Sequence, residues 1–295
     1  MSLTDTQIQH YRREGYVVLP SFFDGEAIGV VDAVVQKITD EALANGNTAG
    51  VMELEPEQDG EIRQPRRILE PFELDQGFRG IATDDRLLDC IESLVGPDIF
   101  VNLSKLNFKP ARVGSPVEWH QDLAYYPHTN DDLVTALIYL DNATEENGCL
   151  QVLPRHHHHF FEHSLADGRF AGMITEPLDD GRYGRAVPLA APAGSVILLH
   201  PITPHSSRPN RSDRARRTLI FGFRASDAVP IWTNLRVATM ESHSKLVRGK
   251  PAKFGRFGGP APLLPVFDDT HEFKSLYTLQ DEAREKTSGG LPEGM

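Results

Sequence analysis

Hydrophobic residues recur at helical spacing in the first part of the chain. Thr4 and Gln7 have the spacing of a helix-capping box, and Gly15 is expected to end that helix. A short apolar strand is predicted over residues 16–19. Asp24 is then expected to cap a longer helix, whose core-facing stripe is Ile28, Val31, Val35, Ile38 and Ala42.

A different pattern begins near residue 99, after a further helix predicted from about 84 to 95 and ended by Gly96-Pro97. Short apolar runs here are separated by Gly, Pro and Asn, which is typical of strands joined by turns. The predicted strands cover residues 100–108, 134–140, 149–153, 187–189, 195–199 and 218–223. Because helices come first and strands later, we expect a mainly β sandwich or barrel with the N-terminal helices packed on one side.

Two polar segments complete the predicted organisation. Residues 47–66 are predicted to form a loop, and residues 283–295 a flexible C-terminal tail. The chain has 295 residues, of which 40% are hydrophobic, enough for one sizeable core. We therefore expect a single domain over residues 1–282.

The composition narrows the class of protein and its partners. The net charge of −12 disfavours nucleic-acid binding, which needs a basic surface. No apolar run approaches the roughly 20 residues that span a bilayer, and the N-terminus has no signal-peptide pattern. Cys90 and Cys149 provide no disulfide framework. We expect a cytoplasmic protein, monomer or homodimer, that acts on a small molecule without membrane or nucleic-acid partners.

The segment Trp119-His120-Gln121-Asp122 carries the first candidate chemistry. In an extended backbone the side chains of His120 and Asp122 point to the same face. One imidazole and one carboxylate are two thirds of the facial triad of non-heme Fe(II) oxygenases. Such a triplet alone is common without a metal. The loop after the apolar strand 195–199 offers two candidates for a third ligand, His200 and His205.

Basic residues in the predicted strands are candidates for anion binding. An arginine inside a barrel is costly unless it is paired, and a dicarboxylate would pair Arg216. Arg217 points to the opposite face, and periodicity alone does not decide which of the two faces inward. Lys105, Asn107 and Lys109 share one face of a strand, where they either bind 2-oxoglutarate or an anionic substrate in a cleft, or are solvated at a sheet edge.

Three ordered segments carry a family resemblance: Trp119 to Pro127, Glu146 to Pro154 and His205 to Asn210, supported by Tyr11 to Leu19. Over about residues 4–230 the chain resembles the phytanoyl-CoA dioxygenase family of Fe(II)/2-oxoglutarate-dependent oxygenases. The resemblance implies a double-stranded β-helix, the jelly roll of cupins. It also implies a reaction with Fe(II), 2-oxoglutarate and O2 that hydroxylates an unactivated carbon of a small organic substrate and releases succinate and CO2.

The same resemblance assigns roles to individual residues. It implies His120, Asp122 and His205 as iron ligands, and it implies Arg216, assisted by Ser207, as the site of the distant carboxylate of 2-oxoglutarate. Related halogenases have a small residue in place of the carboxylate, so Asp122 favours hydroxylation.

The substrate is less well determined. Lys105, Ile138 and Arg155-His156 depart from the pattern of phytanoyl-CoA hydroxylases, so we do not expect that substrate. Residues that face substrate, or only pack beside the site, are Gln121, Tyr125, His128, Lys109 and Trp232. His156 to His159 is interpreted as a polar loop and not as a second metal cluster. The alternative functions are a catalytically silent jelly-roll binding protein and a cupin-type metalloenzyme that does not use O2.

Overall fold

The computed structural model describes residues 2–44, 50–55, 64–178, 181–231, 241–259 and 276–288. Within these ranges the chain forms an eight-stranded and a four-stranded sheet, both antiparallel. The larger sheet has the order β1-β9-β6-β11-β4-β3-β2, and β12 also pairs with β4. Its strands are β1 Tyr16–Leu19, β9 Val196–Leu199, β6 Leu133–Tyr139, β11 Arg216–Ala225, β4 Ile99–Lys109, β3 Pro65–Leu69, β2 Met52–Leu54 and β12 Lys245–Arg248.

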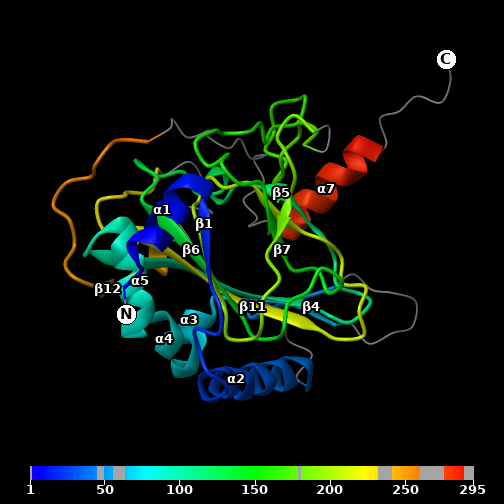
Figure 1. Ribbon diagram of the computed structural model, residues 1–295. Coiled ribbons are helices and arrows are strands. Elements are labelled where there is room, and N and C mark those ends of the chain that lie inside the picture. Colours follow the sequence, from blue (N-terminus) through cyan, green and yellow to red (C-terminus); the bar gives the residue numbers. More distant parts are fainter. Residues whose placement is uncertain are drawn as a thin grey trace.

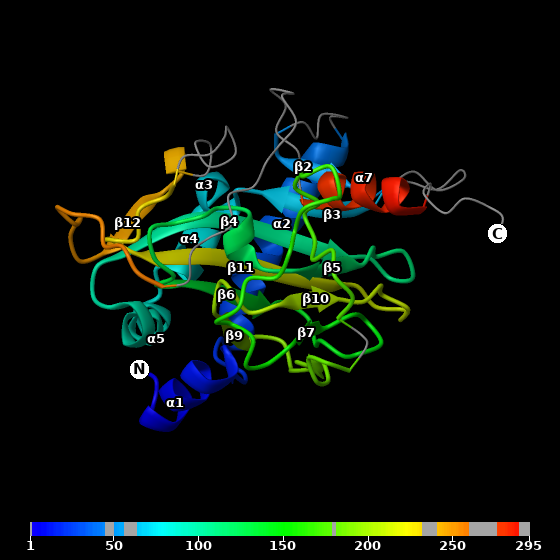
Figure 2. The ribbon, with the colours of Figure 1, turned by 90° about the horizontal axis from the view of Figure 1, so that it is seen from above.

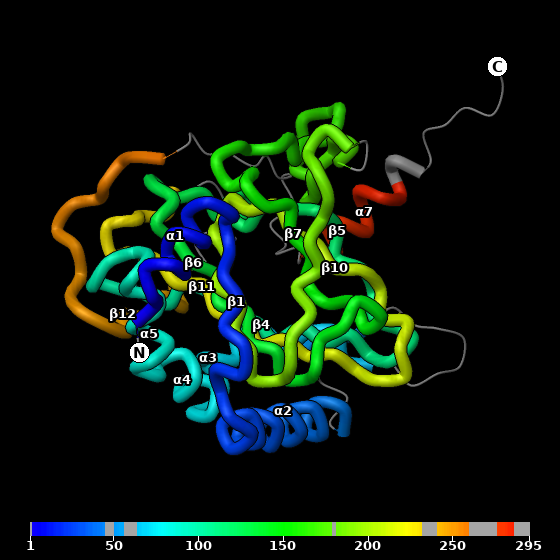
Figure 3. Tube along the Cα trace, viewed as in Figure 1, coloured from blue at the N-terminus to red at the C-terminus, as the bar shows by residue number. Residues whose placement is uncertain are grey.

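The smaller sheet has the order β5-β10-β7-β8. Its strands are β5 Val117–His120, β10 His205–Ser207, β7 Leu150–Val152 and β8 Val187–Pro188. Seen from above, β5, β10 and β7 lie beside the long strands β4 and β11 of the larger sheet (Figure 2). The tube view shows the same two groups of strands with the helices outside them (Figure 3). This is the two-sheet arrangement expected of a jelly roll.

The outer side of the larger sheet is covered by α2 Gly25–Ala44, α3 Pro71–Leu74, α4 Gln76–Ala82 and α5 Asp85–Val95. Helix α1 Asp5–Glu14 lies beside the edge strand β1. Figure 1 shows α2, α3 and α4 on the side of this sheet that faces away from β5 and β7. The predicted capping box forms, because Gln7 N donates to Thr4 Oγ1 at 3.3 Å and Thr4 N donates to Gln7 Oε1 at 2.9 Å. The predicted helical stripe of α2 is also confirmed, with Ile28, Val31 and Val35 buried.

Alternation along β6 and β11 separates the apolar core from the interior between the sheets. Ile138, Leu219 and Phe221 are buried in the core shared with the helices. Their neighbours in sequence point to the other face, where Arg216 and Thr218 lie. Arg217 points outward and pairs with Asp141 and Asp32 at 2.6 and 2.9 Å. The period of two therefore places Arg216, and not Arg217, in the interior.

Two sequence predictions need correction. The predicted loop 47–66 contains β2 and the first residues of β3, which pair with each other. The predicted tail from residue 283 begins inside α7 Leu276–Ser288, and Ala283 is buried. Helix α7 has a polar composition, so its sequence resembles that of a loop. Polar contacts help to hold it in place: Arg284 Nε lies 2.9 Å from Glu118 Oε1, and Gln280 Nε2 donates to Gly172 O at 2.9 Å. None of the described helices is long and apolar enough to span a membrane.

Candidate active site

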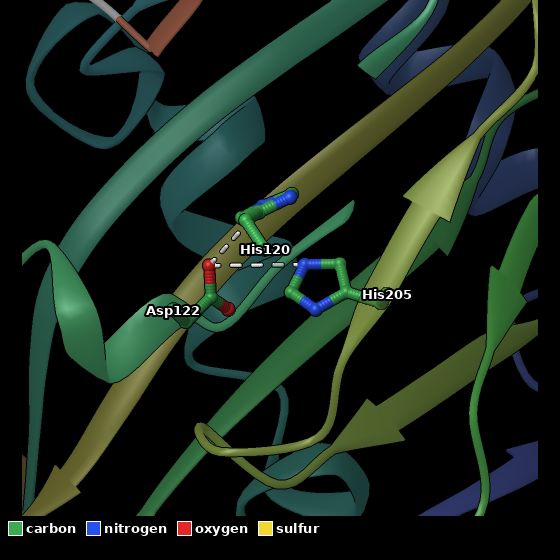
Figure 4. A group of neighbouring side chains, drawn as sticks. All are labelled: His120, Asp122 and His205. Atoms are coloured by element: carbon green, nitrogen blue, oxygen red, sulfur yellow. Dashed lines mark ion pairs between the residues drawn. The ribbon is translucent and has the colours of Figure 1, made fainter. Parts of the chain in front are cut away.

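Three predicted ligands meet at one point between the sheets (Figure 4). His120 ends β5, Asp122 begins the short 3-10 helix η1 Asp122–Ala124, and His205 begins β10 directly opposite His120. The Nε2 atoms of both histidines lie 3.9 Å from Asp122 Oδ1. All three side chains are buried. His200 does not join this group: its Nε2 lies 3.6 Å from Asp131 Oδ2.

Backbone carbonyls fix the orientation of both imidazoles. His120 Nδ1 lies 2.8 Å from Glu118 O, and His205 Nδ1 lies 2.9 Å from Thr203 O. Since a carbonyl only accepts, each Nδ1 carries the hydrogen and each Nε2 keeps its lone pair for a metal. Thr135 Oγ1 donates to Asp122 Oδ2 at 2.6 Å, which leaves Oδ1 toward the histidines.

The charge states also suit a divalent metal. Burial lowers the pKa of His120 well below its usual value, and it lowers the pKa of His205 as well, so both imidazoles are neutral. Burial alone would raise the pKa of Asp122, but Lys105 and the hydrogen bond from Thr135 help to hold it below the usual range. Two neutral nitrogens and one carboxylate are the donor set of the facial triad.

A first chamber, here called the Arg216 chamber, opens on this triad. Besides the three ligands, its polar lining is Lys105, Asn107, Ser206, Ser207, Arg216, Thr135, Thr218 and Tyr139. Arg216 is 5% exposed. Its guanidinium donates to Thr218 Oγ1 at 2.6 Å and to Gly148 O, while its buried Nε has no hydrogen-bond partner among the described residues. A buried guanidinium that has an unused donor and forms no ion pair with a described carboxylate fits an anionic ligand.

A second chamber, here called the Arg67 chamber, shares His120 and Asp122 with the first. It is lined in addition by Arg67, Leu69, Glu70, Leu103, Ser104, Lys105, Tyr125, Tyr126 and Leu276. The triad therefore lies where two chambers meet, and a metal there would be open to one ligand from each side.

The residues that were predicted to bind 2-oxoglutarate line the same chamber as Arg216. Ser207 lies two positions after His205 on β10, so both side chains reach the Arg216 chamber. Lys105 and Asn107 line the same chamber from β4. Because β4 is bordered by β11 on one side and by β3 and β12 on the other, the alternative of an exposed sheet edge is wrong.

Three predicted substrate contacts lie outside both chambers. Gln121 is fully buried, and its Nε2 donates to His159 O and Ile202 O, both at 2.6 Å, so it packs beside the site. Lys109 Nζ donates to Ser115 O under a loop. His128 Nδ1 lies 2.7 Å from Tyr126 O. The hydrogen bonds of Gln121 join segments that are far apart in the chain, so they leave no signal in the sequence.

The structure also places Tyr125 and the first histidines of the His156 to His159 tract. Tyr125 lines the Arg67 chamber, and its hydroxyl donates to Gly172 O. Trp232 lies outside the described residues. His156 Nε2 and His157 Nε2 contact the carbonyls of Tyr183 and Arg12 at 3.0 and 3.1 Å. Among the described residues the triad is the one group of such donors that could hold a metal.

Sequence reasoning missed several lining residues. Thr218 lies two residues after Arg216 on the same strand, so its side chain points to the same face. This alternation could have identified it from the sequence. Arg67 and Glu70 directly follow the segment 47–66 that was predicted as a loop, and Leu276 lies on α7, a helix that was not predicted. These three carry no motif, because tertiary packing alone brings them to the site.

Comparison with known proteins identifies the family. The family description Phytanoyl-CoA dioxygenase (PhyH) matches residues 11–218. The chain belongs to the phytanoyl-CoA dioxygenase family. It is 33% identical over 234 residues to a probable alpha-ketoglutarate-dependent hypophosphite dioxygenase of Stutzerimonas stutzeri, covering 76% of this chain and 80% of that protein. It is 27% identical to a methylphosphonate hydroxylase of Gimesia maris, covering 76% of this chain and 82% of that protein.

A solved structure shares the fold of this family member. The crystal structure of EctD from S. alaskensis with 2-oxoglutarate and 5-hydroxyectoine superimposes with a TM-score of 0.62 and 21% identity, covering 90% of this chain and 88% of that chain. These findings confirm the predicted jelly-roll fold. Together with the triad they also confirm the enzyme class, an iron- and 2-oxoglutarate-dependent dioxygenase.

Proposed function

We propose that His120, Asp122 and His205 hold Fe(II), that the Arg216 chamber receives 2-oxoglutarate, and that the Arg67 chamber receives the substrate. The enzyme then hydroxylates an unactivated carbon of a small anionic compound. The observation that carries this proposal is the position of the triad between two chambers, each with a buried arginine. Two chambers on one triad fit a co-substrate and a substrate that react at the same metal.

The chain's own groups support iron binding before any substrate enters. His120 and His205 offer Nε2, and Asp122 offers Oδ1 while Thr135 holds its other oxygen. Iron bound there supplies the activation of O2 that is coupled to the conversion of 2-oxoglutarate to succinate and CO2. The protein supplies ligation, orientation and burial, which protect the reaction from water.

Arg216 supports the binding of 2-oxoglutarate at the far end of its chamber. A carboxylate would accept from the unpartnered Nε and from the hydroxyl groups of Ser207 and Thr218 nearby. This arrangement holds the distant carboxylate and leaves the keto acid end toward the triad. Lys105 and Asn107 add polar groups from the neighbouring strand β4.

The second chamber supports a small anionic substrate. Arg67 and Lys105 line it beside the apolar side chains of Leu69, Leu103 and Leu276. Two relatives are named for hypophosphite and methylphosphonate, which are small phosphorus oxyanions. Organophosphonates are therefore the first substrate class to test. Both cysteines are buried and neither forms a disulfide, which supports the prediction of a reducing cytoplasm.

Spectroscopy tests this proposal with a matched pair of variants. Anaerobic addition of Fe(II) and 2-oxoglutarate should give a weak visible charge-transfer band. His205→Ala should abolish both the band and succinate formation, while His200→Ala should retain both. Loss of the band in His200→Ala alone would contradict the ligand assignment. A band without oxygen-dependent succinate formation would favour the silent binding protein, and no band at all would favour a non-oxidative metalloenzyme.

A further inference from the structure

Arg67 brings an unsatisfied positive group to the substrate chamber. It is 4% exposed, and its Nε donates to Asn107 Oδ1 at 3.1 Å. The nearest carboxylate oxygen that pairs with it, Glu53 Oε2, is 3.9 Å from Nη1. Its Nη2 is buried and has no hydrogen-bond partner in the part of the chain that the structure describes. A buried guanidinium with a free donor at the wall of a cavity is suited to an anion.

Glu70 brings a negative group to the same chamber, three residues further along the chain. Ser104 fixes this carboxylate, because its backbone N and its Oγ donate to Glu70 Oε2 at 3.1 and 2.9 Å. The other oxygen, Oε1, accepts no hydrogen bond from any described residue. One half of the carboxylate is thus anchored and the other half is available.

The backbone at Glu70 is held in an uncommon conformation. Its φ of +43° and ψ of +52° lie in the left-handed region, which is costly for a residue other than glycine, asparagine or aspartate. Glycine at this position would remove the strain and the carboxylate together. Strain of this kind persists where the surroundings enforce it, and it is concentrated at functional sites. Here it turns a carboxylate toward the chamber that opens on His120 and Asp122.

Burial raises the pKa of Glu70, and the hydrogen bonds from Ser104 and the charges of His243 and Lys105 offset this only in part. A carboxylate in this state gains from a further positive partner. Such a partner would enter with the substrate.

We propose that Glu70 is a specificity-determining residue that binds a positively charged nitrogen of the substrate, while Arg67 binds its anionic group. The substrate class is then a small zwitterion, such as an amino acid or an aminoalkylphosphonate, and not a simple anion. This inference rests on the proposed function, because it assigns the substrate to the Arg67 chamber. It adds a cationic group that the proposed function does not require.

A substrate panel with matched variants tests the inference. The panel contains α-amino acids and ω-aminoalkylphosphonates, each beside its N-acetyl derivative and beside the same acid without nitrogen. Turnover should be concentrated in the zwitterions. Glu70→Gln should lower kcat/KM for these by roughly ten- to a hundredfold, the effect of a lost charged hydrogen bond. The amide oxygen can still accept from Ser104, so the loop conformation and Tm should be kept.

The control is Glu73→Gln, which changes an acidic residue on α3 that pairs with Lys245 at 3.6 Å and does not line the chamber. It should leave the substrate preference unchanged. Equal or better turnover of the acids without a charged nitrogen would overturn the inference. So would a Glu70→Gln variant with the kcat/KM of the parent protein, or a panel in which no zwitterion is bound or converted.

These failures are distinct from a failure of the proposed function. The charge-transfer band with Fe(II) and 2-oxoglutarate, and the slow formation of succinate without substrate, do not involve Glu70. If both persist while the zwitterions fail, the inference alone is overturned. If both are missing in the parent protein, the proposed function is overturned first.

Discussion

Thr135 is the residue that orients the carboxylate of the triad, through its 2.6 Å hydrogen bond to Asp122 Oδ2. Thr135→Val keeps the shape of the side chain but leaves this buried oxygen without a donor. We expect Fe(II) affinity to fall by roughly ten- to a hundredfold, because outer partners of metal ligands have effects of this size. Titration with Fe(II) and 2-oxoglutarate measures it. Thr83→Val, at an exposed helix end, is the control, and equal losses in both variants would contradict the role of Thr135.

Arg216 and Arg217 form a natural pair for a second test, because they lie on opposite faces of β11. Arg216→Met should raise the KM for 2-oxoglutarate by roughly ten- to a hundredfold, since it removes a charged donor to the carboxylate. Arg217→Met removes the outward ion pairs with Asp141 and Asp32. It should lower Tm slightly and leave that KM unchanged, because partly exposed ion pairs contribute little. The reverse pattern would show that the wrong arginine had been assigned.

At the scale of elements, helix α7 contributes to the site although it follows the part of the chain that matches the family. The match ends at residue 218, and α7 begins at Leu276. Leu276 lines both chambers. The ring of Tyr277 lies 3.6 Å from the guanidinium of Arg66 and 4.6 Å from that of Arg67. Figure 2 shows α7 beside β3 and β5, the strands that carry Arg67 and His120. The helix therefore supports the wall that holds Arg67.

Removal of that ring gives a prediction at this scale. Tyr277→Ala should raise the KM for the substrate and the fraction of succinate formed without product, because Arg67 loses its packing and water gains access. It should also lower stability by about 3 kcal/mol or more, the cost of truncating a buried aromatic residue. Steady-state kinetics measures the KM and the uncoupled succinate, and thermal melting measures the stability. Thr278→Ala on the exposed side of α7 should change none of the three, and an unchanged KM in Tyr277→Ala would show that α7 does not support the substrate chamber.

At the scale of the whole molecule, buried histidines link stability to pH. Burial lowers the pKa of His128 and His163 to about 4 and that of His200 to about 3. Their usual value is about 6.5, so below it the unfolded chain binds more protons than the folded protein. The stability that these neutral histidines contribute should be fully present above pH 6.5, and the free energy of unfolding should fall as the pH drops toward 4. His128→Phe should reduce this slope in thermal melts, and a higher Tm at pH 5 than at pH 8 would contradict the prediction.

Local signals in the sequence account for much of the fold. The capping box at Thr4 forms as predicted, and the helix predicted from about residue 84 to 95 is α5, since each depends on neighbours within a few residues. The strand predicted over 218–223 is the centre of β11. The segments that were missed, β2, β3 and α7, are polar and are stabilised by distant partners such as the contact between Arg66 and Tyr277. Their hydrophobic pattern is therefore weak.

Three ordered motifs are local features of the chain, and they are enough to indicate the family, the jelly roll that the family implies and a short set of candidate ligands. Which of these groups meet depends on contacts between distant segments. The tertiary structure brings His205, and not His200, to His120 through the pairing of β10 with β5. It also turns Arg216 inward and brings Glu70, Arg67 and Leu276 to one chamber. These residues come from strands and a helix far apart in the chain, and only long-range packing sets the distances between them.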